Sequence, residues 1–179
     1  MSPPPLLLEA AGLEDVPALV ELEQSCFSHP WTSAHFRGEI EAGPGARVLV
    51  LRESSLDPKG TYGILGYCIL RSVVDELHIK NLAVHADLRR QGLGRWLLRV
   101  ALSLGLRLGA RAAYLEVRRA NAAAVALYQS EGFVAAGVRT GYYRDPEEDA
   151  LVFSRTLAPG AFPGDSSPPP FLEKGLGAW

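Results

Sequence analysis

The residues best placed for chemistry lie in one short segment, Arg89-Arg90-Gln91-Gly92-Leu93-Gly94-Arg95. Its two glycines let the backbone approach a ligand closely. An amphipathic stretch from Leu93 predicts a helix, whose first turn offers free N–H groups and a positive dipole. The arginines add charge-assisted hydrogen bonds to phosphate oxygens. The segment therefore predicts a loop that binds a phosphate-bearing ligand.

Two common phosphate-binding loops do not match this segment. No Gly-Lys-Ser or Gly-Lys-Thr follows the glycines, as a P-loop requires. The Gly-x-Gly-x-x-Gly spacing of dinucleotide-binding folds fails at Leu97. On these residues alone, a simple turn with solvated arginines stays open as the alternative.

Other segments give the loop a context. Residues 81–84 precede it, and residues 114–121 and 121–133 follow the amphipathic stretch. Together with the (Gln/Arg)-x-x-Gly-x-(Gly/Ala) pattern of the loop, they resemble the GNAT acetyltransferases. Within that family they are most similar to the branch that acetylates the N-terminal alanine of a bacterial small-subunit ribosomal protein. The resemblance spans most of residues 6–157 and includes Phe-Ser-His-Pro-Trp at 27–31 and Tyr-Tyr at 142–143.

The resemblance implies acetyl-CoA as cosubstrate and no metal. One set of residues would supply strand backbone groups to the acetyl and pantetheine portions: Leu82, Ala83 and Val84. A second set would wrap the pyrophosphate: Arg90, Gln91, Gly92, Leu93, Gly94 and Arg95. Asn121 would contact the cosubstrate and also cap a helix.

The resemblance also implies Glu116 as general base and Tyr128 as general acid. A protein α-amine has a pKa of about 7.7–8.0, so roughly a tenth is neutral at pH 7 and a carboxylate suffices to take its proton. A phenol with a pKa of about 10 stays protonated and can donate to sulfur. Three alternatives stay open: Glu116 as a solvated charge paired with Arg118, Tyr128 as a core residue, and Glu76 as the base.

Charge and cysteine content narrow the class of protein. The net charge is −2, so no bulk charge indicates nucleic-acid or membrane binding, yet residues 80–119 hold nine of the eighteen basic side chains and only two of the twenty acidic ones. Cys26 and Cys68 lack metal-type spacing. Neither a signal peptide nor an apolar run of about 18 residues is found. We expect a cytoplasmic protein without direct nucleic-acid or membrane contact.

These residues must be positioned by alternating strands and helices. The resemblance implies an α/β fold with a GNAT-type mixed, mostly antiparallel sheet of six to seven strands flanked by about four helices. Periodicity predicts strands at 6–9, 47–51, 62–70, 74–84, 112–117, 133–138 and 150–156. Helices are expected after Asp15 and Thr32 as N-caps, from Leu93 to near Gly109, and from Asn121 to Gly132.

We expect one acetyltransferase domain over residues 1–157 and a flexible Pro/Gly-rich tail over 158–179. The favoured function is acetylation of a ribosomal protein N-terminus. A GNAT acting on a small-molecule amine or on lysine side chains, and a non-catalytic CoA-binding partner subunit, remain the alternatives. The acidic run at 145–149 is expected either to attract a basic acceptor peptide or to form a solvated hairpin loop.

Overall fold

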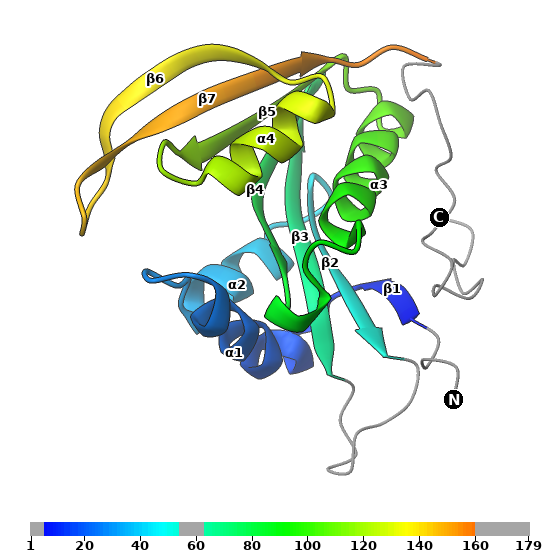
Figure 1. Cartoon of the computed structure of the whole chain (residues 1–179). Coiled ribbons are helices and arrows are strands. Elements are labelled where there is room, and N and C mark those ends of the chain that lie inside the picture. Colours follow the sequence, from blue (N-terminus) through cyan, green and yellow to red (C-terminus); the bar gives the residue numbers. More distant parts are fainter. Residues whose placement is uncertain (1–5, 54–62, 160–179) are drawn as a thin grey trace.

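The computed structural model describes residues 6–53 and 63–159, which form a twisted sheet with helices on both faces (Figure 1). Within these two ranges, seven strands follow the order β1-β2-β3-β4-β5-β7-β6, and among them only the β4–β5 pair is parallel. The expected mixed, mostly antiparallel sheet is confirmed. The strands are β1 (Leu6–Ala10), β2 (Ala46–Glu53), β3 (Ile64–Val73), β4 (Glu76–Val84), β5 (Ala112–Arg118), β6 (Val134–Tyr143) and β7 (Glu148–Thr156).

The described residues contain four α-helices, at the predicted places. Asn121 caps the last of them, because its Oδ1 accepts a hydrogen bond from the Ala124 N–H at 3.2 Å. Gly109 and Gly132 end two helices with φ angles of +92° and +81°, which glycine adopts without a steric penalty. The helices are α1 (Val16–Cys26), α2 (Ser33–Ile40), α3 (Leu93–Arg107) and α4 (Ala122–Ser130).

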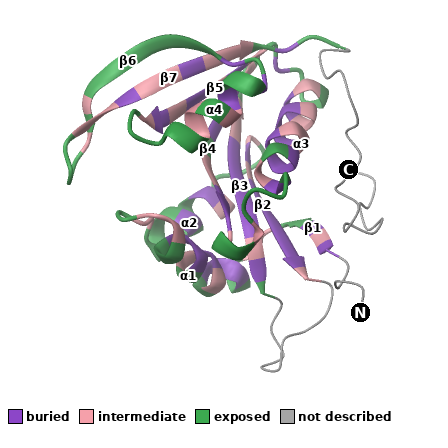
Figure 2. Cartoon of the chain, in the orientation of Figure 1, coloured by how far each residue is buried: buried purple, intermediate pink, exposed green. Residues whose placement is uncertain are grey.

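Alternating side chains of the strands feed two hydrophobic cores, one on each face of the sheet. Leu49 and Leu51 of β2 point to the core under α3 and α4, whereas Val48 and Val50 point to the core under α1 and α2. Figure 2 shows the buried residues concentrated in the central strands and the helix faces that cover them. Strand β6, by contrast, is exposed along most of its length.

Two expectations need correction, and two others lie outside the described residues. Asp15 occupies the N-cap position of α1 but makes no capping hydrogen bond; its buried carboxylate accepts from the Gly12 N–H at 2.9 Å and from Arg52 at 3.0 Å. The strand expected over 74–84 begins at Glu76, because a tight turn precedes it. Tyr62, expected in a strand, and the expected tail beyond Pro159 lie outside the described residues.

The parallel pair of β4 and β5 separates partway along the sheet. Residue pairing ends at Ile79 and Leu115, while the strands continue to Val84 and Arg118. A bulge in the β3–β4 register at Lys80 bends β4 at the same level. Both strands keep their outer partners, β3 and β7. Their inner edges therefore face a gap between them.

Candidate active site

Three adjoining cavities follow this gap. The loop cavity, about 610 Å³, lies beside the glycine loop and the start of α3. The central cavity, about 930 Å³, shares Leu82 and Ala124 with it. The sheet groove, about 600 Å³, shares Trp31, Glu116 and Tyr142 with the central cavity. A ligand in the loop cavity and a second one in the groove would meet in the central cavity.

The glycine loop has the open geometry that an anion requires. Gly92 sits at the N-cap of α3 with φ +86°, and a Cβ added there would meet no atom within 4 Å. Arg90 has φ +64° and lines the loop cavity, and within the described chain its guanidinium has no partner. The loop thus presents one available guanidinium beside the positive end of a helix.

Other members of the predicted loop set are engaged within the protein. Arg95 lines the cavity, but its guanidinium binds Glu131 at 3.0 Å and Ser130 at 3.3 Å. The Gln91 side chain donates to the Asp87 carbonyl at 3.0 Å. The Leu93 side chain is buried in the core, so this residue offers only its backbone to a ligand at the start of α3. Arg89, whose motif position the sequence singled out, donates to the Val84 carbonyl at 3.0 Å.

The strand residues predicted to contact the cosubstrate lie along the gap. Leu82 lines both the loop and the central cavities, and Val84 lines the loop cavity. The side chain of Ala83 is buried in the core under α1, which leaves its backbone at the strand edge. Asn121 lines the central cavity while its amide oxygen caps α4. Gly94 lines the loop cavity on the first turn of α3.

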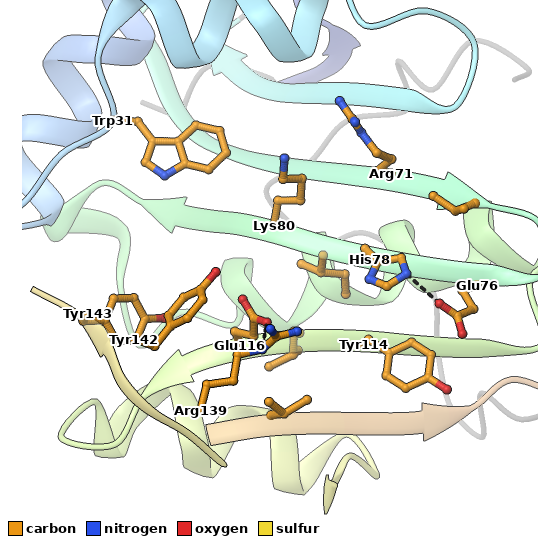
Figure 3. Close-up of a pocket in the computed structure, with 14 residues that line it drawn as sticks. Trp31, Arg71, Glu76, His78, Lys80, Tyr114, Glu116, Arg139, Tyr142 and Tyr143 are labelled. Carbon is orange, nitrogen blue, oxygen red and sulfur yellow. Dashed lines mark hydrogen bonds and ion pairs between the residues drawn. The ribbon is translucent and has the colours of Figure 1, made fainter. Parts of the chain in front are cut away.

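Glu116 lies on the inner edge of β5 and lines both the central cavity and the sheet groove (Figure 3). Its side chain is 28% exposed, and its Oε1 is 2.6 Å from Nε of Arg139 on β6. Tyr142 lies three residues after Arg139 on β6, and a hydrogen bond to Glu116 raises the pKa of its phenol. The carboxylate is therefore fixed by β6 while it faces both spaces.

Tyr128 of α4 lines the central cavity. The residue is 8% exposed and its ring packs edge-on against Phe133, with centroids 5.9 Å apart. Burial raises the pKa of the Tyr128 phenol above its usual value, so the group keeps its proton at neutral pH. The Tyr128 ring thus packs in the core while its residue also lines the central cavity.

The sequence reasoning missed Glu23 of α1, which is 1% exposed and lines the central cavity. Its carboxylate accepts hydrogen bonds from the Trp31 N–H at 3.0 Å, from Asn81 Nδ2 at 3.2 Å and from the Tyr67 hydroxyl. A signal was present: Glu23 follows Val16 by seven residues and Leu19 by four, on the buried face of the helix. A charge on that face indicates a buried polar network.

The acidic run at 145–149 is partly used inside the protein. Glu148 binds Arg118 at 3.2 Å and Asp149 binds Arg119 at 3.2 Å. Asp145, 91% exposed at the hairpin turn, lies 3.3 Å from His29 of the α1–α2 loop. Two of these acids thus neutralise arginines of β5 and the turn after it instead of facing the groove.

Over residues 6–53 and 63–159, the side chains form no group of three or more His, Cys, Asp or Glu placed to hold a metal ion. None of the helices in these ranges is long and apolar enough to span a membrane.

Comparison with known proteins identifies this arrangement. The sequence profile of the Acetyltransferase (GNAT) family matches residues 16–133. The ribosomal protein bS18-alanine N-acetyltransferase of Escherichia coli is 37% identical over 146 residues, which cover 80% of this chain and 93% of that protein.

Solved structures agree with the sequence matches. The crystal structure of the ribosomal-protein-S18-alanine N-acetyltransferase from Escherichia coli superposes with a TM-score of 0.75 at 31% identity, covering 86% of this chain and 94% of that one. The crystal structure of Arabidopsis thaliana NAA60 in complex with acetyl-CoA shares the fold, with a TM-score of 0.73 at 16% identity over 85% and 98% of the two chains.

Proposed function

The chain belongs to the GNAT acetyltransferase family and is an N-acetyltransferase, and from this we propose that it transfers acetyl from acetyl-CoA to the N-terminal alanine of a small-subunit ribosomal protein. The observation that carries the proposal is the 37% identity to the Escherichia coli bS18-alanine enzyme over 80% of this chain. The adjoining cavities support it, because Glu116 and Tyr128 both line the central cavity, which shares lining residues with the loop cavity and the sheet groove. We place this reaction in the cytoplasm, where ribosomal proteins are made.

The loop cavity suits the pyrophosphate of acetyl-CoA. Arg90 offers its guanidinium, and the amides around Gly92 and Gly94 lie at the positive end of α3. Leu82 and Val84 line the same cavity, so the inner edge of β4 lies where the pantetheine portion of acetyl-CoA would extend from the loop. Acetyl-CoA supplies the acetyl group, and its thiolate is the leaving group.

In this proposal Glu116 takes the proton of the acceptor amine at a carboxylate oxygen, directly or through a water molecule. The amine nitrogen bonds to the acetyl carbon as the carbon–sulfur bond breaks. An α-amine, with a pKa of about 7.7–8.0, needs only a weak base near pH 7. The bond from Arg139 to Oε1 holds the carboxylate in place.

Tyr128 is the group proposed to protonate the departing sulfur. Its phenol lines the central cavity, and burial keeps it in the neutral form that can donate a proton. A backbone N–H on the inner edge of β4 is available to the acetyl oxygen. No covalent enzyme intermediate is required.

Mass spectrometry tests the proposal. We expect the enzyme with acetyl-CoA to add one acetyl group to the α-amine of peptides that copy the N-terminus of the small-subunit ribosomal protein. Glu116→Gln should lower kcat by about 10²- to 10⁴-fold, the range of general-base contributions, with the fold intact by circular dichroism. Unmodified alanine-starting peptides, with acetylated polyamines or lysine side chains in the same assay, would instead support the small-amine or lysine alternative.

A further inference from the structure

The sheet groove extends well past Glu116, the proposed base. Trp31, Tyr142 and Tyr143 surround its end at the central cavity, and Glu76 and Tyr114 lie at its far end (Figure 3). The inference below rests on the proposed function, because it takes the occupant of this groove to be the acceptor peptide.

The register of the sheet gives the length of this path. Glu76 pairs with Ala112 in the parallel ladder, and Glu116 lies four residues further along β5. At about 3.3 Å per residue, the two carboxylates are separated by about 13 Å along the strands. An extended peptide with its first residue at Glu116 places its fifth residue beside Glu76, and a long side chain at the third or fourth residue can span the remaining distance.

Three cations along the groove already have carboxylate partners. Arg71 binds the buried carboxylate of Glu39 at 3.0 Å, and Lys80 binds the same carboxylate, so these two cations share one negative charge. Arg139 binds Glu116. Glu76 is 43% exposed, and its partner is the imidazole of His78 at 2.8 Å. At this exposure the Glu76 carboxylate stays accessible to an added cation from the groove.

An aromatic surface lies beside this carboxylate. The rings of His78 and Tyr114 stack with centroids 5.5 Å apart and an interplanar angle of 23°. Lysine and arginine side chains lay their carbon stems along such faces and direct the charged end to a carboxylate. The far end of the groove therefore has both features that a long cationic side chain needs.

We propose that Glu76, His78 and Tyr114 form a subsite for a basic side chain at the third, fourth or fifth residue of the acceptor. This assigns Glu76 to acceptor recognition, not to the role of base that the sequence left open. It also moves the source of acceptor charge selection from the 145–149 hairpin to the start of β4.

Peptides that begin with alanine and carry one arginine, scanned over positions 2 to 6 of a neutral background, test the subsite. We expect kcat/KM to be about two- to fivefold higher with arginine at one of positions 3 to 5, the size of a half-exposed ion pair. Glu76→Gln should remove this preference through the peptide KM, with kcat and the acetyl-CoA KM unchanged. Glu76→Lys should shift the preference to peptides with glutamate at that position.

Glu21→Lys is the matched control, because it changes the net charge equally at an exposed position of α1 outside the groove lining. It should leave the positional preference in place. Acetylation without positional preference, or a fall in kcat for Glu76→Gln, overturns the subsite and leaves the proposed function standing. If no peptide in the series is acetylated, the proposed function fails and the subsite fails with it.

Discussion

Tyr128 carries a prediction about pH, because burial raises the pKa of its phenol above the usual value of about 10. A raised pKa keeps the proton-donating form present to higher pH. We expect kcat to rise as the acceptor amine loses its proton near pH 8 and then to stay level up to pH 10. Tyr128→Phe should lower kcat by about 10²-fold, with the acetyl-CoA KM nearly unchanged.

Steady-state rates measured from pH 6 to pH 10.5 decide this prediction. Tyr114→Phe, compared at saturating peptide because Tyr114 belongs to the proposed acceptor subsite, is the control: it removes a phenol at the far end of the groove and keeps the ring, and its kcat should match the wild type. A raised pKa of Tyr128 would be contradicted if the wild-type kcat fell through a single ionisation near pH 9 while the kcat of Tyr128→Phe did not fall.

Some site residues were predictable because local sequence determines them. Gly92 and Asn121 are tied to the start of a helix by a positive φ and by a cap, both readable over a few positions. The partners of the site residues were not predictable. Arg139 reaches Glu116 from a different strand, and Glu23 meets Asn81 across 58 residues. Such contacts depend on the folded sheet and leave no local pattern.

Among the elements, α3 lies closest to the sheet at Gly105. A Cβ added to Gly105 would be 2.6 Å from Leu77 Cδ2 and 3.2 Å from Leu77 Cβ, and Leu77 is fully buried in β4. Gly105→Ala should therefore lower the free energy of unfolding by about 1–3 kcal/mol, as overpacked cores do. For a domain of this size the melting temperature should fall by about 2–4 °C per kcal/mol.

Gly38 of α2 is the matched control, because a Cβ there meets nothing within 4 Å and the residue is exposed. Gly38→Ala should stabilise the protein by about 0.5–1 kcal/mol through helix propensity alone. Thermal unfolding of both variants separates the two effects. Equal shifts in the same direction would refute close packing of α3 on β4.

The order and type of the elements were predictable from periodicity, and their ends less so. Strand β6 continues to Tyr143, five residues past the expected end at 138, because its pairing with β7 supplies the hydrogen bonds. Asp15 occupies the expected N-cap position, but its carboxylate binds Arg52, 37 residues away, instead of capping the helix. Ends of elements are set by tertiary partners, which a local pattern does not contain.

Over the whole molecule, the basic window at 80–119 serves two purposes. Glu131 binds both Arg95 and Arg99 and offsets one of their two charges, and Glu148 and Asp149 pair with Arg118 and Arg119 at the end of β5. The acids come from outside the window, so the net charge is balanced by folding. At the glycine loop, Arg90 has no partner within the described chain, and Arg89 keeps its charge because its partners there are the Val84 carbonyl and Cys26 Sγ. The basic region expected from the sequence thus combines arginines paired with carboxylates and arginines whose charge remains at the loop cavity.

The walls of the cleft are connected through Glu23. Its carboxylate joins α1 to Asn81 on β4, next to the strand edge proposed for acetyl-CoA, and to the backbone of Trp31 in the acceptor wall. Glu23→Ala removes the acceptor of one buried donor, the Tyr67 hydroxyl, and of two partly buried donors, the Trp31 N–H and the Asn81 amide; a buried donor left unpaired costs about 1–3 kcal/mol. A loosened Trp31 should also raise the KM for the peptide.

Glu23→Gln is the conservative variant that separates shape from charge. Its amide oxygen can still accept hydrogen bonds from Trp31 and Asn81. Its NH₂ group can donate to the hydroxyl oxygen of Tyr67, because a hydroxyl oxygen accepts as well as donates. We therefore expect Glu23→Gln to keep most of the stability and a peptide KM within about threefold of wild type, a loss below about 1 kcal/mol. Glu23→Ala should unfold at lower temperature and raise the peptide KM more than the acetyl-CoA KM. If both variants lose activity equally while remaining folded, the charge of Glu23 itself is needed and a purely positional role is wrong.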